Sequence, residues 1–177
     1  EAVELLGNHK PSGIYRGGKY SLFEAGTRVP FVTYWKGKIE PKVSDSMVSQ
    51  IDLFASLANL TGSEETTQDS QNLLDVFLGN SSNGRDQYVL EAMSRTAFRQ
   101  GNWVMIPPYK GPKKMWGKDV ETGNSKTHLL YNLEEDPEQK INLAKTHPDK
   151  LEEMIQNFEK IRGEGYKQSA APNTENP

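Results

Sequence analysis

A short turn rich in glycine carries the cation of this sequence that is best suited to chemistry. Lys19 directly follows Gly17 and Gly18. Its ammonium group is a compact point charge with three hydrogen-bond donors, which suits a tetrahedral oxyanion. A lysine in such a turn is also common as a solvated surface residue, so the glycine-glycine-lysine run by itself leaves both roles open.

A long polar loop, residues 107–127, combines aromatic rings with cations. Its members of these two kinds are Tyr109, Lys110, Lys113, Lys114, Trp116 and Lys118. Loops of more than about 12–15 residues are often functional or disordered, and rings beside cations can hold an anionic sugar by stacking on its face. The alternative is a solvated loop with one half-buried tryptophan.

The composition is that of an ordinary globular protein of about one domain. The chain has 177 residues, a length at which about 70% of the unfolded surface can be buried. It carries 21 Lys and Arg against 24 Asp and Glu, which argues against a nucleic-acid partner. Cysteine is absent, which excludes disulfides and a cysteine nucleophile in this chain. No apolar run approaches the ~18 residues of a membrane span, so we expect no membrane partner.

The first half of the chain predicts one strand and two helices. Residues 28–39 are rich in β-favouring types on both faces, as in a strand that is covered on two sides. Residues 45–61 follow helical spacing, and residues 73–79 predict a short apolar helix ended by Gly79. A doubly covered strand needs a sheet, and this sequence supplies few neighbours for it.

The second half predicts an antiparallel sheet followed by a helix. The expected strands cover residues 88–93, 95–100, 102–106 and 128–133. The helix begins near Pro148 and carries an apolar stripe made of Leu151, Met154, Ile155, Phe158 and Ile161. Strands and helices mixed in this way indicate an α+β unit.

The basic turn belongs to a longer motif. Residues 13–30 read GIYRGGKYSLFEAGTRVP and closely resemble the second signature of the arylsulfatase-type sulfatases, roughly G-x-x-R-G-G-K-x-x-x-[FY]-E-G-G-x-R-V-P followed by a strand ending in W-P-G. Trp35-Lys36-Gly37 stands where W-P-G is expected, and Ala25 replaces the first glycine of E-G-G. Alanine has a cost there only if the position needs a positive φ.

Two further segments continue the resemblance in the same order. Residues 48–58 are similar to the family helix that follows this strand. Residues 129–144, LLYNLEEDPEQKINLA, are similar to the closing LYDLxxDPxExxNLA strand and turn. Together the three segments span most of the chain.

The resemblance implies an α/β fold like that of alkaline phosphatase, of which this chain would be the C-terminal part. Residues 1–86 would end the catalytic domain with the last part of its large sheet. Residues 87–166 would form a C-terminal subdomain with an antiparallel sheet of about four strands and a helix. Residues 167–177 are expected to be a loose tail.

The same resemblance implies hydrolysis of sulfate esters, with a sulfated carbohydrate or an aryl sulfate as the substrate. Lys19 would be the catalytic residue that binds the sulfate. His9, ten residues earlier, would contact the substrate, although an exposed loop histidine is the alternative. Glu24 and Arg28 would either line the pocket or form a buried ion pair, and we favour the pair. His128 and His147 are expected to be structural.

The cofactors implied by the resemblance have no matching motif in this sequence. Sulfatases use a formylglycine made within C/S-x-P/A-x-R, and a calcium ion held by an Asp-Asp pair and a later D-N-G. Calcium prefers six to eight oxygen ligands, and no segment here offers such a group. We therefore expect this chain to hold no metal, to be inactive alone, and to need the N-terminal portion of the same protein as its partner. Periplasmic or secreted localisation is the corresponding expectation.

Two other functions stay open, the first of them implied by the resemblance. One is a phosphoester or phosphonate hydrolase of the same superfamily, which would differ in the nucleophile and metals of its N-terminal part. The other is a non-catalytic glycan-binding or structural module, which would bind glycan by itself.

Overall fold

The structure is a computed structural model that describes residues 9–65, 67–117 and 119–163. The chain divides into two compact units, one formed by the segment up to Val29 together with the residues from Gln87 onward, the other by Pro30–Asp86. The predicted domains, residues 1–86 and 87–166, stay a prediction; in the structure the segment up to Val29 groups with the residues from Gln87 onward. The whole of the predicted tail, residues 167–177, and the first eight residues lie outside the described residues. No described helix is long and apolar enough to cross a membrane.

The C-terminal unit contains the predicted antiparallel sheet, with its strands in sequence order. These are β1 (Gln87–Ala92), β2 (Arg95–Gln100), β3 (Trp103–Ile106) and β4 (Leu129–Asn132). Successive residues of a strand point to opposite faces, and the register places Phe98, Met105 and Leu130 in one row. The neighbouring row, which includes Val104 and Tyr131, faces the other way.

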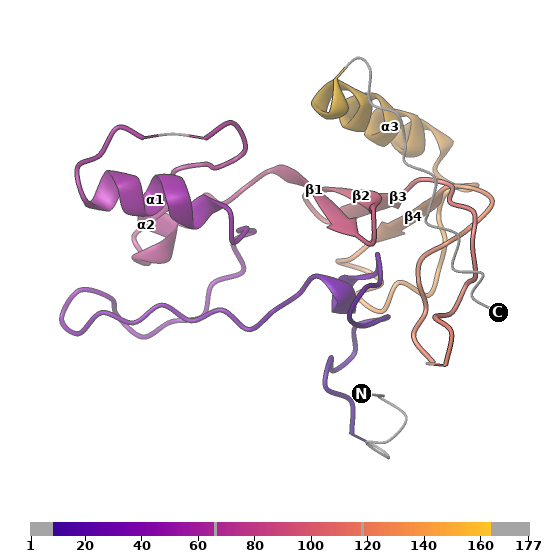
Figure 1. Cartoon of the computed structure of the whole chain (residues 1–177), viewed down its shortest axis with the longest axis horizontal. Helices are drawn as coiled ribbons and strands as arrows, with labels where there is room; N and C mark the ends of the chain where they lie inside the picture. The colour runs from indigo at the N-terminus through magenta and orange to yellow at the C-terminus, as the bar shows by residue number, and fades with distance from the viewer. Residues whose placement is uncertain (1–8, 66, 118, 164–177) are drawn as a thin grey trace. The chain divides into compact units, whose positions relative to one another are not determined.

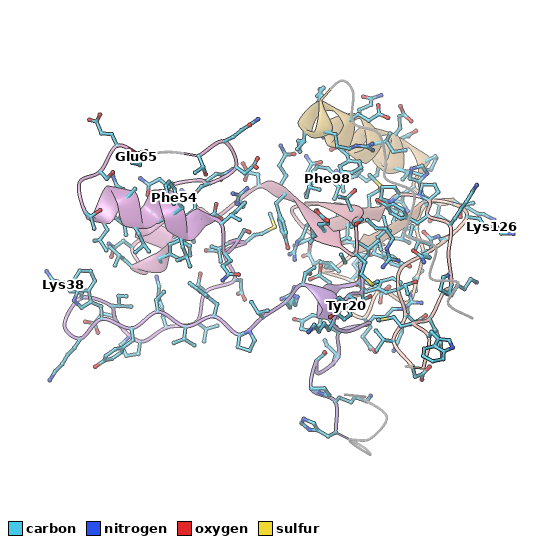
Figure 2. All side chains as sticks on the ribbon, viewed as in Figure 1. Tyr20, Lys38, Phe54, Glu65, Phe98 and Lys126 are labelled. Carbon is cyan, nitrogen blue, oxygen red and sulfur yellow. The ribbon has the colours of Figure 1, made fainter. Side chains whose placement is uncertain are left out.

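Each face of the sheet has its own core. Helix α3 (Pro148–Arg162) covers one face, where Met154 and Phe158 pack on Phe98. Figure 1 shows the sheet between α3 and the short 3₁₀ helix η2 (Glu24–Gly26), and Figure 2 places Phe98 on the α3 side. The opposite core contains Leu22 and Phe23 from the segment that precedes η2. The basic turn is therefore packed directly on the sheet.

Helix α3 confirms most of the predicted stripe. Pro148 occupies its first turn, and Gly163, with φ +71°, follows its last residue. The rings of Phe98 and Phe158 stack with their centroids 5.8 Å apart. Ile161, the last predicted member of the stripe, is instead half exposed.

In the second unit, the helix predicted over residues 45–61 begins later. Helix α1 spans Asp52–Leu60, and α2 spans Leu74–Phe77. The residues before α1 are held by the end of the unit, because the Arg85 amide donates to the Met47 carbonyl at 2.7 Å. Backbone groups that bond at long range cannot also form the first helical turns, so the prediction of a helix start at residue 45 was wrong.

The strand predicted over residues 28–39 is also wrong. This described segment is extended but has no strand assignment, and Val32 and Tyr34 are 87% and 83% exposed. Phe31 does pack against Phe77, with ring centroids 5.5 Å apart. A strand requires hydrogen-bonding neighbours, which this segment lacks among the described residues. A contiguous exposed apolar patch of this kind is typical of an interaction surface.

A buried ion pair closes the second unit. The carboxylate of Asp52 accepts hydrogen bonds from Nε of Arg85 at 2.7 Å and from Nη2 of the same side chain. The amides of Ser49 and Gln71 donate to it at 2.9 and 3.0 Å. Burial raises the pKa of Asp52, but these hydrogen bonds outweigh burial and leave the pKa below its ordinary value. The loop before α1, the loop before α2 and the end of the unit thus meet on one side chain.

We expect Asp52→Asn to lower the free energy of unfolding by about 3–5 kcal/mol, because it leaves the Arg85 charge buried without a partner. The folded-state pKa of Asp52 is depressed, so its stabilisation is present above about pH 4 and is lost as the pH falls through the lower folded value. Urea unfolding at pH 7 and pH 3 measures both effects. Asp45→Asn, at an exposed position, is the control; equal stability of the two variants at pH 7 would contradict the prediction.

Candidate functional site

The turn that carries Lys19 is tight and strained. The Ser21 amide donates to the Gly18 carbonyl at 2.9 Å, and Tyr20 has φ +76°. A non-glycine residue in this left-handed region costs on the order of 1–3 kcal/mol and persists only where its surroundings fix it. Lys19 itself is exposed, and its ammonium nitrogen lies 5.0 Å from the centroid of the Tyr20 ring (Figure 2 labels Tyr20). No acid within the described residues pairs with this ammonium.

Two glycines of the motif are required by close packing. Gly17 has φ +88°, and a Cβ on it would overlap the Ser21 hydroxyl. A Cβ on Gly26 would overlap the backbone carbonyl of Ser21. Ala25 lies within η2 and does not have a positive φ, so its replacement of a family glycine carries no conformational cost.

A hairpin formed by residues 113–122 holds the turn from outside. Its two arms pair between Lys114 and Glu121. The Leu22 amide donates to the Thr122 carbonyl at 3.1 Å, and the Ser21 hydroxyl donates to the Glu121 carbonyl at 2.6 Å. The polar loop predicted over residues 107–127 therefore contains a hairpin, and this hairpin is hydrogen-bonded to the Lys19 turn.

Arg16 ties the same turn to two distant segments. Its Nε and Nη2 each donate to the carboxylate of Glu121 at 2.6 Å, and its Nη1 donates to the Gln139 carbonyl at 2.6 Å. The guanidinium also lies 4.1 Å from the centroid of the Phe23 ring. The hydrogen bonds from Arg16 lower the pKa of Glu121, and the pKa of Arg16 is raised by the same pair. Arg16 is thus occupied by structure and is not a free cation.

Glu24 forms the predicted ion pair with Arg28, and it has a second partner, Arg99, that the sequence analysis did not predict. Its carboxylate accepts from Nε of Arg28 at 2.7 Å and from Nη1 of Arg99 at 3.2 Å. Glu24 is 2% exposed, and its amide donates to the side-chain oxygen of Gln139 at 2.8 Å. Arg99 and Gln139 lie far from Glu24 in the sequence, so no local pattern could have indicated them.

The histidines occupy different settings. His9 is exposed, and its predicted contact with a substrate stays a prediction. Burial lowers the pKa of His128. The ring of His147 packs at 5.7 Å from that of Trp103, and its Nδ1 lies 3.0 Å from the Thr146 hydroxyl. These contacts are those expected of a structural histidine.

Trp116 is the most exposed large apolar residue of the described chain. It lies in the turn of the 113–122 hairpin and is 97% exposed, which is more than the half-buried ring that the sequence suggested. On the same hairpin Lys113 is exposed, and Lys114 pairs with Asp119. The exposed indole of Trp116 is an aromatic face that is available for stacking.

A shallow groove of about 330 Å³ lies beside the hairpin. It is lined by Ile14, Arg16, Glu121, Glu138 and Lys140. Lys19 is not among these residues, so the groove and the candidate cation are separate features. Charges of both signs line the groove, which does not favour a simple anion site there.

The described residues do not assemble a metal site. No three His, Asp or Glu side chains come together within the described ranges. A calcium ion needs a larger set of oxygen ligands, so this part of the chain does not fit the ion that the family resemblance implies.

Comparison with known proteins agrees with this architecture. A family model described as Sulfatase matches residues 5–63. An N-acetylgalactosamine-6-O-sulfatase of Bacteroides thetaiotaomicron is 40% identical over 166 residues, covering 92% of this chain and 32% of the relative. Bovine arylsulfatase A is 28% identical, covering 82% of this chain and 32% of the relative.

Solved structures give the same result. A Bacteroides thetaiotaomicron protein, described in connection with the metabolism of multiple glycosaminoglycans, superposes with a TM-score of 0.84 at 39% identity, covering 90% of this chain and 34% of that one. A Pseudoalteromonas sulfatase superposes with a TM-score of 0.63 at 18% identity, covering 81% of this chain and 31% of that one; this likeness concerns the fold alone.

The chain belongs to the sulfatase family, and its four-stranded sheet and helix are those of the C-terminal subdomain of that fold. It spans about a third of the length of the sulfatases it matches.

The packing of the turn predicts different costs for two glycine substitutions. Gly26→Ala should destabilise the fold by about 1–3 kcal/mol, the usual cost of overpacking, because the added methyl would meet backbone that cannot yield. Gly18→Ala is the control, since its Cβ would lie 3.5 Å from Val120, an ordinary contact. Chemical unfolding of both variants measures the difference. A Gly26→Ala variant as stable as Gly18→Ala would show that the turn is looser than described.

Proposed function

We propose that a complete sulfatase containing this chain hydrolyses sulfate esters of a saccharide, and that Lys19 binds the sulfate. The observation that carries the proposal is the difference in pairing among the charged side chains of the Lys19 turn. Its neighbouring charges, Arg16 and Glu24, are held in ion pairs, whereas the Lys19 ammonium is exposed and has no acidic partner within the described residues.

The chemistry of the reaction explains why such a cation is needed. When a sulfate ester is cleaved, negative charge is held on the non-bridging oxygens and develops on the leaving oxygen. Donors that are fixed in advance stabilise this charge without reorganising during the reaction. The three N–H donors of Lys19 suit a sulfate oxygen, and the strained Tyr20 limits the directions in which the turn can present them.

The formylglycine and the calcium ion of the family would supply the nucleophile and a further positive charge. The described residues do not fit either group, so both belong to other parts of the complete enzyme. The role we assign to this chain is to bind and orient the substrate.

A sulfated amino-sugar saccharide is the substrate class we favour. The support is the 40% identity, over nearly the whole chain, to a relative named as an N-acetylgalactosamine-6-O-sulfatase. His9 and Trp116 are the residues we assign to the sugar. The exposed ring of Trp116 can stack on a sugar face, and the exposed imidazole of His9 can hydrogen-bond a hydroxyl.

We expect Lys19→Ala in the complete enzyme to lower kcat/KM for a sulfated saccharide by about 10²–10³-fold, the usual cost of losing one oxyanion donor. Steady-state kinetics measures this change. Lys10→Ala is the matched control, because it removes another exposed lysine of the same segment. Near-normal kinetics in Lys19→Ala would remove Lys19 from the site.

Trp116→Ala should raise KM for a sulfated oligosaccharide several-fold, since stacking contacts are worth about 0.5–1.5 kcal/mol. The same variant should leave a small aryl sulfate, which has no second ring to stack, almost unaffected. Trp116→Phe, which keeps an aromatic face, is the control. Equal losses on both substrates would indicate that Trp116 packs against protein instead of sugar.

A further inference from the structure

Arg95 is a buried arginine whose hydrogen-bond partners in the described part of the chain are neutral groups. It begins β2, directly after the turn from β1, and is 4% exposed. Its Nη1 donates to the side-chain oxygen of Asn124, and its Nη2 donates to the carbonyl of Tyr20 at 3.3 Å. Within the described ranges no carboxylate pairs with it.

The other shielded arginines of the chain differ from it. Arg16 faces Glu121, Arg99 faces Glu24, and Arg85 faces Asp52. Burying a charge without a counter-charge costs several kcal/mol. Burial lowers the pKa of Arg95, the direction expected where desolvation is not balanced by a carboxylate. Each of these three guanidinium groups lies against a carboxylate, although Arg99 shares Glu24 with Arg28. Arg95 has no carboxylate partner within the described residues, so its positive charge is the least compensated of the four.

That place is the back of the Lys19 turn. The carbonyl that Arg95 holds belongs to Tyr20, the residue after Lys19 and the one with a φ of +76°. A strained residue keeps its conformation only when its surroundings fix it, and this hydrogen bond is one of the contacts that do so. The side chain of Asn124, the second partner, also donates to the Pro112 carbonyl at 2.9 Å, which links Arg95 to the loop that leads into the 113–122 hairpin.

We propose that Arg95 is a positioning residue for the Lys19 turn, and that its unneutralised charge draws the sulfate group of the substrate to Lys19 from behind the turn. The inference rests on the proposed function of Lys19 and deepens it. Lys19 contacts the anion, whereas Arg95 acts through the Tyr20 carbonyl and through its field. Charges lining a site of low dielectric raise the local concentration of an oppositely charged ligand by about 10–10³-fold.

Asn124→Asp in the complete enzyme tests the field without removing Arg95. The substitution keeps an oxygen acceptor for Nη1 and adds one negative charge beside the guanidinium, but it also removes the amide that donates to the Pro112 carbonyl. Asn124→Ala, which loses the same donor without adding charge, separates the effect of the charge from the effect of the lost hydrogen bond. We expect the inhibition constant of inorganic sulfate, and KM for the sulfated substrate, to rise on the order of tenfold, the low end of such electrostatic effects. The control is Asn83→Asp, which adds the same charge at an exposed position of the other unit.

Arg95→Gln removes the positive charge of Arg95 itself. This variant should raise the inhibition constant of inorganic sulfate by a factor similar to that of Asn124→Asp. Arg95→Lys keeps the charge and should restore sulfate binding in part. Thermal unfolding of each variant identifies the folded proteins. If the role of Arg95 is purely structural, the variants should differ from the parent in thermal stability. Sulfate binding by Arg95→Gln and Arg95→Lys should then be the same.

The inference is overturned if folded Asn124→Asp or folded Arg95→Gln binds sulfate as the parent does. It is also overturned if Arg95→Lys binds sulfate no better than Arg95→Gln, since the charge would then have no role. Lys19→Ala, measured beside them, separates the two proposals. If only Lys19→Ala weakens sulfate binding, the proposed function stands and the role of Arg95 falls; if Lys19→Ala binds sulfate normally, the proposed function itself fails.

Discussion

The buried carboxylate of Glu24 is the interaction on which the site depends. Arg28 binds it from the end of the basic turn and Arg99 binds it from β2, while the Glu24 amide donates to Gln139 in the loop after β4. A carboxylate that is 2% exposed needs such partners, because an unpaired buried charge is strongly destabilising. The need of the Glu24 carboxylate for hydrogen-bond partners fixes the turn on the sheet. Its partner Arg99 lies on β2, so the carboxylate is fully paired only when the turn and the sheet are in contact.

The same requirement decides which cations are left for a ligand. Arg16 is held by Glu121 and Arg28 by Glu24, so the acids next to the turn are already occupied by arginine. The ammonium of Lys19 lies near the ring of Tyr20 and pairs with no acid among the residues that the structure describes. A guanidinium suits such internal pairs because its planar fork matches a carboxylate in two places, whereas a single mobile ammonium can follow a tetrahedral anion. The division of labour between arginine and lysine is therefore a consequence of their geometry.

The sequence predicted what local patterns encode and missed what long-range contacts decide. Alternating apolar residues indicated all four strands of the sheet, and the stripe on Met154 and Phe158 indicated α3. The motif around Lys19 located the candidate cation. Glu121, Gln139 and Arg99 support the turn from positions 75 to 123 residues away from their partners, and nothing in their local sequence distinguishes them from ordinary polar residues. The late start of α1 has the same origin, because Met47 bonds to Arg85.

Residues 28–39 are the remaining segment in which the structure differs from the prediction, because the predicted strand is not formed. Its sequence has the apolar pattern of a strand covered on both faces, yet Val32 and Tyr34 are exposed. Strand propensity expresses how well a residue fits a pleated surface with neighbours, and it does not form a strand where neighbours are lacking. The chain spans about a third of the length of the sulfatases it matches. Among the described residues this segment has no strand partner, so its exposed apolar side chains are the part of the sequence pattern that the described chain leaves unsatisfied.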